Sequence, residues 1–333
     1  MVLIGEKAVP EFIFEAKKHF PQCHANCFLP LPDGRKLCVY FAGTKEKAGD
    51  VGIWLSEFDG KTWLSPRLIA KISEEPHWNP VIFPVKEGIR LVFKTGKEIK
   101  DWKSHTMLSR DGGKTFGELH AYEANPAGGP VRSKPIRLSN GALLAPNSDE
   151  EGPWLPRADI SLDEGETFER WGKIPVNITD ETGPDFIAGK GAIQPVLWES
   201  APGKVHALLR TSGGFIFRSD SLDYGKTWCT AYPLEMPNNN SGIDAVRAED
   251  RKIYLICNPV SGNWAARTPL CVYVSEDNGM HFRHFAMVDD TPLHPDTGKP
   301  AELSYPSLAV HAGKLQAVYT WNRIAMAYWE KKL

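Results

Sequence analysis

The amino-acid sequence predicts an all-β fold, namely a six-bladed β-propeller of four-stranded antiparallel blades that forms a single domain over residues 1–333. Three observations support this prediction. A short turn motif recurs at a near-constant interval, strand-like segments lead into the turns, and the interval divides the chain into six similar parts. With 42% hydrophobic and 24% charged residues, the composition is that of an ordinary globular protein with enough apolar residues for such a core.

The recurring motif reads Ser-x-Asp-x-Gly-x-Thr-aromatic. It is complete at Ser109–Phe116, Ser161–Phe168 and Ser221–Trp228, and degraded at Ser56–Trp63 and Ser275–Phe282. Phe58 takes the place of the aspartate in the first degraded copy, and His281 that of the threonine in the second. The opening serines stand 52 to 60 residues apart. An interval of this length exceeds one rung of a solenoid and suits a four-stranded propeller blade.

Each element of the motif fits a hairpin turn. The aspartate accepts hydrogen bonds from backbone amides, the glycine supplies a positive φ, and the Thr-aromatic end packs the turn onto the strand below. Leu270–Val274, for example, leads into its turn as a strand. We expect these turns to mark five blades and Ser304–Asn322 to form the sixth, with strands at Ser307–Val310 and Lys314–Tyr319 and an N-terminal strand such as Ala8–Phe14 as its closing member.

On these repeats the chain resembles the sialidase (neuraminidase) superfamily, whose six-bladed propellers carry such turns, called Asp boxes or BNR repeats. The resemblance covers nearly the whole chain. It implies a glycoside hydrolase in which three arginines hold the substrate carboxylate, a tyrosine attacks the anomeric carbon, a glutamate takes the tyrosine's proton and an aspartate is the acid/base. The boxes lie away from the active site in this superfamily, so they predict the fold rather than the function.

Three positions match the superfamily's catalytic motifs. Arg210 ends a segment that resembles the one carrying the second arginine, and Arg267 follows an Asn-Pro pair as the third arginine does. Tyr305, in Ser304–Leu308, resembles the nucleophile. The resemblance also implies an aspartate acid/base in the loop after the first inner strands, where Asp50 is the candidate and Glu46 its alternative.

Two positions depart from the superfamily's pattern. Gln194 stands where the catalytic glutamate is expected, and Glu199 lies five residues on, which in a regular strand directs it to the opposite face. His24 stands where the first arginine is expected. Glutamine cannot take a proton, and imidazole lacks the bidentate geometry of a guanidinium. These exchanges weigh against hydrolysis of sialic acid itself, and leave open double displacement, inverting attack by activated water, and weak activity on another ulosonic or uronic acid.

Further polar and aromatic residues lie at similar points of the repeats, where propellers bind their ligands. The predicted substrate-binding residues are Arg210, Arg267, Arg132, Lys134, His77, Trp78, Asn239 and Asp244. Arginines suit a carboxylate, amides suit hydroxyls, and a tryptophan suits the face of a sugar ring. We expect Arg132, Lys134, Arg210 and Arg267 to form an anion site. For each of these residues a structural role in an ion pair, a turn or the core is the alternative.

The leading functional prediction is a sialidase-like glycoside hydrolase acting on a terminal, acidic sugar of an oligosaccharide, with Asp50, Tyr305, Gln194 and His24 as the candidate catalytic positions. The first alternative is a uronate-cleaving lyase, because His24 and His77 suit proton abstraction beside a carboxylate. The second is a propeller that binds carbohydrate without turnover. We expect the partner to be a glycan, and leave the oligomeric state open.

The overall charge and the cysteines exclude several other classes. A formal charge of -2 favours neither nucleic acid nor an anionic membrane as a partner. The first ten residues include Glu6 and Lys7 and contain no apolar stretch of signal-peptide length, which favours a cytoplasmic location. Cys23 and Cys27 lack the close second pair typical of structural zinc sites, so we expect neither a metal nor another cofactor.

Overall fold

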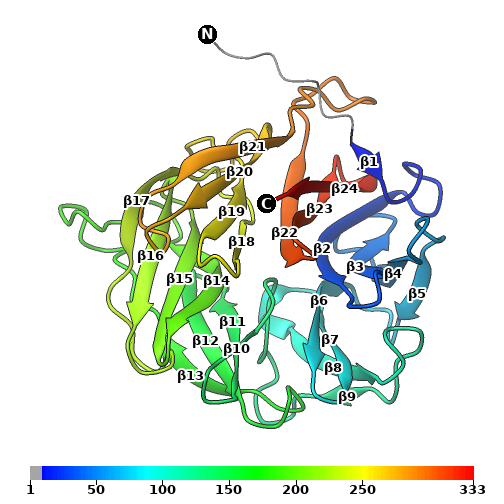
Figure 1. Cartoon of the computed structure of the whole chain (residues 1–333), viewed down its shortest axis with the longest axis horizontal. Helices are drawn as coiled ribbons and strands as arrows, with labels where there is room; N and C mark the ends of the chain where they lie inside the picture. Colours follow the sequence, from blue (N-terminus) through cyan, green and yellow to red (C-terminus); the bar gives the residue numbers. More distant parts are fainter. Residues whose placement is uncertain (1–9) are drawn as a thin grey trace.

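Six sheets of four antiparallel strands surround a central axis like the blades of a propeller (Figure 1). The structure is a computed structural model that describes residues 10–333. The first three blades comprise β2 (Gln22–Pro30), β3 (Lys36–Gly43), β4 (Gly52–Phe58) and β5 (Arg67–Ala70); β6 (His77–Val85), β7 (Gly88–Thr95), β8 (Lys103–Ser109) and β9 (His120–Ala121); and β10 (Ile136–Arg137), β11 (Leu143–Asp149), β12 (Leu155–Ser161) and β13 (Glu169–Lys173). The predicted fold class is confirmed.

The remaining blades follow the same pattern. They comprise β14 (Ala192–Ala201), β15 (Lys204–Thr211), β16 (Phe215–Ser221) and β17 (Tyr232–Pro237); β18 (Asp244–Arg247), β19 (Ile253–Cys257), β20 (Leu270–Ser275) and β21 (Arg283–Asp289); and β22 (Leu303–His311), β23 (Lys314–Trp321), β24 (Ala325–Lys332) and β1 (Glu11–Phe12). One short 3-10 helix, Ile99–Asp101, precedes β8. Among the described residues, no helix has the length and apolar character that crossing a bilayer requires.

The sixth blade joins the two ends of the chain. Glu11 pairs with Tyr328 and Phe12 with Ala327, so β1 is the outermost strand beside β24. The predicted closure by an N-terminal strand is therefore confirmed for its described part, while Ala8, within the predicted strand, lies outside the described residues. The last blade therefore combines strands from both ends of the described residues.

The turn motifs join the third strand of a blade to its fourth. In the second blade, Asp111 accepts hydrogen bonds from the backbone N–H of Thr115 at 2.9 Å and from its hydroxyl at 2.6 Å. Ser109 accepts a bond from the N–H of Gly113 at 2.8 Å, where φ is +86°. First and third strands of an antiparallel blade run in the same direction, so the boxes lie where the inner strands end. We call this the Asp-box end of the central channel.

The degraded first copy keeps its turn by a shift of one residue. Asp59, immediately after Phe58, accepts bonds from the backbone N–H groups of Lys61 at 2.8 Å and Thr62 at 2.9 Å. The aspartate is therefore displaced rather than lost. In the last copy, His281 takes over the role of the threonine by bonding to Asp277 through Nδ1 at 2.7 Å.

Four inner strands share an irregularity near their first residues. The pairing of β2, β6, β14 and β22 with the next strand skips two residues at this point, which is the mark of a β-bulge. One residue in each bulge has a positive φ: Ala25 (53°), Asn79 (40°), Gln194 (53°) and Tyr305 (50°). A bulge changes the direction of a side chain. The four bulges lie at the end of the channel opposite the Asp boxes, which we call the Tyr305 end.

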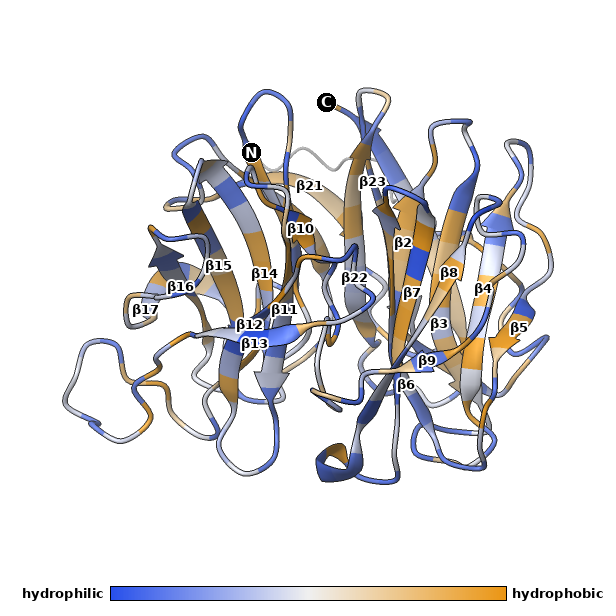
Figure 2. Ribbon diagram, turned by 90° about the horizontal axis from the view of Figure 1, so that it is seen from below, coloured by the Kyte–Doolittle hydropathy of each residue, from blue (hydrophilic) through white to orange (hydrophobic). Residues whose placement is uncertain are grey.

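The rest of each blade is regular and apolar. Figure 2 shows hydrophobic stretches within strands such as β2 and β7, and hydrophilic loops at both ends of the ring. The largest fully buried side chains include Tyr40, Tyr319, Phe28 and Phe93. This packing between neighbouring blades fixes the inner strands, and thereby the residues at their ends.

Candidate functional site

Arg210, near the end of β15, connects the residues of two bulges. Its Nη1 donates a hydrogen bond to the hydroxyl of Tyr305 at 2.8 Å and another to Oε1 of Gln194 at 3.0 Å. Its Nε donates to Oδ1 of Asn240 at 2.9 Å. Only 2% of Arg210 is exposed. A guanidinium fixed in this way stabilises negative charge on the phenolic oxygen.

His24 lies against Tyr305, with the two ring centres 4.3 Å apart. Burial lowers the pKa of His24 well below its usual value. Four cationic side chains lower it further: Arg323, Arg267, Arg210 and Arg132. The Nδ1 atom of His24 is buried and has no hydrogen-bond partner within residues 10–333. His24 is therefore a neutral imidazole in a strongly cationic environment.

Two of these arginines belong to a chain of ion pairs. Arg267 donates to Glu302 at 2.6 Å, Arg323 donates to the same carboxylate at 2.9 Å, and Arg323 also contacts Glu46 at 2.5 Å. The two arginines lower the pKa of Glu302 despite its burial. The sequence did not predict a role for Glu302. Arg267 is thus paired with a carboxylate of the protein, whereas the partners of Arg210 are uncharged.

The predicted anion residues lie at different points along the channel. The guanidinium of Arg132 lies 5.5 Å from the ring centre of Tyr305 and donates to the carbonyl groups of Ile243 and Pro306. Lys134 instead donates to the carbonyl oxygens of Phe28 at 3.1 Å and Leu308 at 3.0 Å. Lys134 as a member of the anion site therefore stays a prediction; its ammonium group is held by backbone carbonyl groups, one of which lies two residues farther along β22 than the contact of Arg132.

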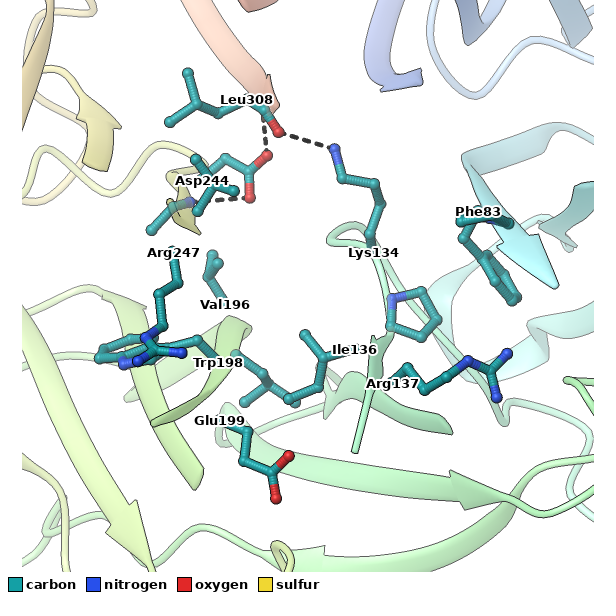
Figure 3. A pocket seen from close by; sticks show the side chains of 15 residues that line it. Phe83, Lys134, Ile136, Arg137, Val196, Trp198, Glu199, Asp244, Arg247 and Leu308 are labelled. Carbon is teal, nitrogen blue, oxygen red and sulfur yellow. Dashed lines mark hydrogen bonds between the residues drawn. The ribbon is translucent and has the colours of Figure 1, made fainter. Parts of the chain in front are cut away.

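Lys134 and Asp244 line a cavity of about 360 Å³ toward the Asp-box end (Figure 3). Asp244 accepts hydrogen bonds from the backbone N–H groups of Ala245 at 3.0 Å and Leu308 at 2.7 Å. Glu199, in the same cavity, accepts from the N–H and hydroxyl of Ser139 and from the N–H of Gly203. Lys134, Asp244 and Glu199 thus have partners within the protein, whereas the buried Nε of Arg247 in the same cavity has none among residues 10–333.

Three further predicted residues are bonded into the structure around the site. His77 donates from Nδ1 to the carbonyl of Glu75 and accepts at Nε2 from the N–H of Ile72. Trp78 donates to the carbonyl of Gly96, and Asn239 to that of Ala266. Because the polar atoms of these buried side chains are occupied, the geometry favours a structural role for His77, Trp78 and Asn239.

Neither predicted acid contacts the tyrosine. Asp50 is exposed and accepts hydrogen bonds from the N–H of Thr44 at 2.8 Å and from its hydroxyl at 2.7 Å. These bonds lower the pKa of Asp50 and keep it ionised. Glu46 is paired with Arg323. Asp50 as the acid therefore stays a prediction, and its surroundings favour the ionised form.

Three residues beside Arg210 were missed by the sequence prediction. The guanidinium lies 5.6 Å from the ring centre of Trp154 and 5.7 Å from that of Trp264, which is 61% exposed. Glu150, immediately after β11, accepts a hydrogen bond from the hydroxyl of Ser148 at 2.9 Å. Only Trp264 offered a signal, since an aromatic side chain in a loop is typical of ligand sites, whereas Trp154 is buried. Within residues 10–333, no cluster of His, Cys, Asp and Glu has the arrangement of a metal site.

Comparisons with known proteins agree with this architecture. The sequence matches the BNR repeat-like domain over residues 34–316. No curated protein matches the chain in sequence. Among solved structures, a Hadza microbial sialidase superposes with a TM-score of 0.79 at 14% identity, covering 98% of this chain and 68% of that one.

Two further structures match over nearly their whole length. A protein of unknown function from Dyadobacter fermentans has a TM-score of 0.73 at 15% identity, with 98% of this chain and 99% of that one covered. The intramolecular trans-sialidase from Ruminococcus gnavus has a TM-score of 0.66 at 13% identity, with 98% and 97% covered. At such identities the structural matches show a shared fold. The chain belongs to the family of proteins with a BNR repeat-like domain, and its propeller is the one found in sialidases.

Proposed function

We propose that the protein is a glycoside hydrolase that removes a terminal acidic sugar from an oligosaccharide. The observation that carries this proposal is the contact of Arg210 with the hydroxyl of Tyr305 at 2.8 Å, beside a neutral histidine and three further arginines. An acidic sugar presents a carboxylate, which a guanidinium binds through charge-assisted hydrogen bonds. The exposed ring of Trp264 offers a surface for the sugar or the group attached to it.

Tyr305 is the residue proposed to face the anomeric carbon. Positive charge develops on that carbon as the glycosidic bond breaks. An oxygen whose negative charge is stabilised by Arg210 can oppose it, either by forming a bond or by electrostatic attraction alone. Gln194 shares Arg210 with Tyr305, and its amide orients the guanidinium but cannot take a proton. The arrangement therefore favours electrostatic stabilisation with attack by water over transfer of the tyrosine proton to residue 194.

The test is release of 4-methylumbelliferone from glycosides of sialic, other ulosonic and uronic acids. Wild-type protein should cleave at least one of them, and Tyr305→Phe should lose most of this activity while binding the free sugar acid with similar affinity. Absence of cleavage together with saturable binding would instead indicate a carbohydrate-binding propeller. Absence of both would contradict the proposal.

A lyase is the second candidate, and one observation favours it. His24 is neutral and its buried Nδ1 lacks a partner, as a base that removes a proton beside a carboxylate would require. A lyase forms a conjugated double bond, so incubation with uronate oligosaccharides would raise the ultraviolet absorbance. That rise, abolished in His24→Gln, would support the lyase and exclude simple hydrolysis of these substrates.

A further inference from the structure

Glu150 differs from the other carboxylates at the Tyr305 end in the partners it has. Glu302 and Glu46 are bonded to arginines, and Asp50 to both the N–H and the hydroxyl of Thr44. Such bonds stabilise the charged form of a carboxylate. The pKa of Glu302 and that of Asp50 are accordingly lowered, and the carboxylate of Glu46 is occupied as the acceptor of Arg323.

Glu150 has a different environment. It is half-buried immediately after β11, where its partners are a hydroxyl and an amide rather than a guanidinium. The hydroxyl of Ser148 donates to it at 2.9 Å, and the side chain of Gln194 forms a second hydrogen bond with it. The charged groups facing it are Arg210 and Lys94, which act from a distance. Burial outweighs these groups and raises the pKa of Glu150 above its usual value.

The position of Glu150 connects it to the proposed reaction centre. The oxygen of the Gln194 side chain accepts from Arg210 at 3.0 Å, and Arg210 donates to Tyr305 at 2.8 Å. The hydroxyl of Ser148 also accepts from the backbone N–H of Gln194 at 3.3 Å, so the bulge that directs Gln194 is fixed to the same segment as Glu150. Glu150 is thus linked to Tyr305 through Gln194 and Nη1 of Arg210.

We propose that Glu150, rather than Asp50, is the general acid of this site. The assignment rests on the proposed glycosidase function. As the bond between the anomeric carbon and the glycosidic oxygen breaks, its electron pair stays with that oxygen, which takes the proton of Glu150. Water then forms the new bond to carbon, and the proton that it releases restores the carboxyl group through solvent.

The experiment compares two glycosides of the same acidic sugar, one with 4-methylumbelliferone and one with an alcohol as the leaving group. An alkoxide needs a proton to leave and a phenolate does not. Glu150→Gln should therefore lower kcat for the alkyl glycoside by about 100- to 10,000-fold and for the umbelliferyl glycoside far less. It should also remove the fall of kcat at high pH. Glu151→Gln, on the exposed neighbouring residue, is the matched control and should behave as wild type.

Glu150→Asp tests the same role in a variant that keeps an acid. It should retain a measurable rate on the alkyl glycoside and the fall of kcat at high pH, and its thermal unfolding shows whether the segment is intact. The assignment alone would be overturned if Glu150→Gln lost the same activity on both glycosides or lost none. It would also be overturned if Asp50→Asn, instead of Glu150→Gln, showed a loss of activity that depends on the leaving group. Wild-type protein that cleaves neither glycoside would overturn the proposed function and the acid together.

Discussion

The two ends of the central channel contain similar charged residues, but the hydrogen-bond partners of these residues differ. At the Asp-box end, Lys134 and Asp244 are bonded to backbone groups of neighbouring inner strands. At the Tyr305 end, buried polar atoms stay without a partner within residues 10–333, namely Nδ1 of His24 and Nε of Arg132. A buried polar group without a hydrogen bond costs about 1–3 kcal/mol. At the Asp-box end Nε of Arg247 is also without a partner among the described residues, so the difference is that the unpaired atoms of the Tyr305 end lie beside a bulged residue.

Both ends of the channel have a cavity nearby, so the position of a cavity alone does not identify the site. The cavity of about 360 Å³ lies toward the Asp-box end, and one of about 520 Å³ is lined by Glu302 and Arg323 toward the Tyr305 end. The bulged residues lie at the Tyr305 end, where Tyr305 and Gln194 share one arginine. Backbone conformations that are rarely adopted tend to occur at functional sites. Substitutions at the Tyr305 end should therefore mainly reduce activity, and substitutions at the Asp-box end should mainly reduce stability.

Arg210→Ala should produce the largest effect on activity. It removes the bonds to Tyr305, Gln194 and Asn240, and kcat/KM should fall by about 100- to 1,000-fold, as when a single preorganised donor is lost. Arg210→Lys should recover only part of the lost activity, because an ammonium group cannot reproduce the planar fork of a guanidinium. The matched control is Arg137→Ala, whose side chain is paired with Glu164 near the other end. An equal loss in this control would contradict a special role for the Tyr305 end.

Lys134→Met should produce the largest effect on stability. It keeps the aliphatic stem and leaves the carbonyl oxygens of Phe28 and Leu308 without their donor, so the free energy of unfolding should fall by about 1–3 kcal/mol. Urea unfolding measures this change. The folded variant should retain the wild-type kcat/KM. A stable variant with reduced activity would show that Lys134 serves the site after all.

The repeats made the fold predictable, because each box combines a turn requirement with a fixed distance to the next. The composition of the site was partly predictable through the context of Arg210, Arg267 and Tyr305. Its geometry was not, because the bulges break the strand alternation used to place side chains. A signal existed in Pro80, Pro195 and Pro306, each of which follows a bulged residue. Proline has no N–H for the sheet ladder and is tolerated at bulges.

Glu150 and Glu302 illustrate what a single sequence does not contain. Their states depend on residues distant along the chain, such as Gln194 for Glu150 and Arg267 for Glu302. No local motif marks either glutamate. Which carboxylate keeps its proton follows from burial and pairing, and these are known only once the blades are placed.

The pH dependence of stability should arise mainly at the Tyr305 end. Burial lowers the pKa of His24, and that of His77 to about 4, whereas both should titrate near 6.5 in the unfolded chain. The unfolded state therefore binds more protons below pH 6.5, and the free energy of unfolding should fall as the pH decreases from about 6.5 to about 4. For His77 the complete change corresponds to about 3 kcal/mol. Urea unfolding across this range should give a flatter profile in His77→Asn than in wild type.

Asp223→Ala should have the smallest effect of the four changes, because a box turn is exposed and supports only its own blade. The substitution removes the acceptor for the N–H of Thr227 at 2.8 Å and for its hydroxyl at 2.6 Å. We expect Tm to decrease by about 2 °C, the scale for losing one modest interaction in a large domain. Activity should not change, since the turn lies at the end of the channel opposite Tyr305. A loss of activity without a decrease in Tm would show that the two ends are coupled, and the separation of stability from chemistry along the channel would then be wrong.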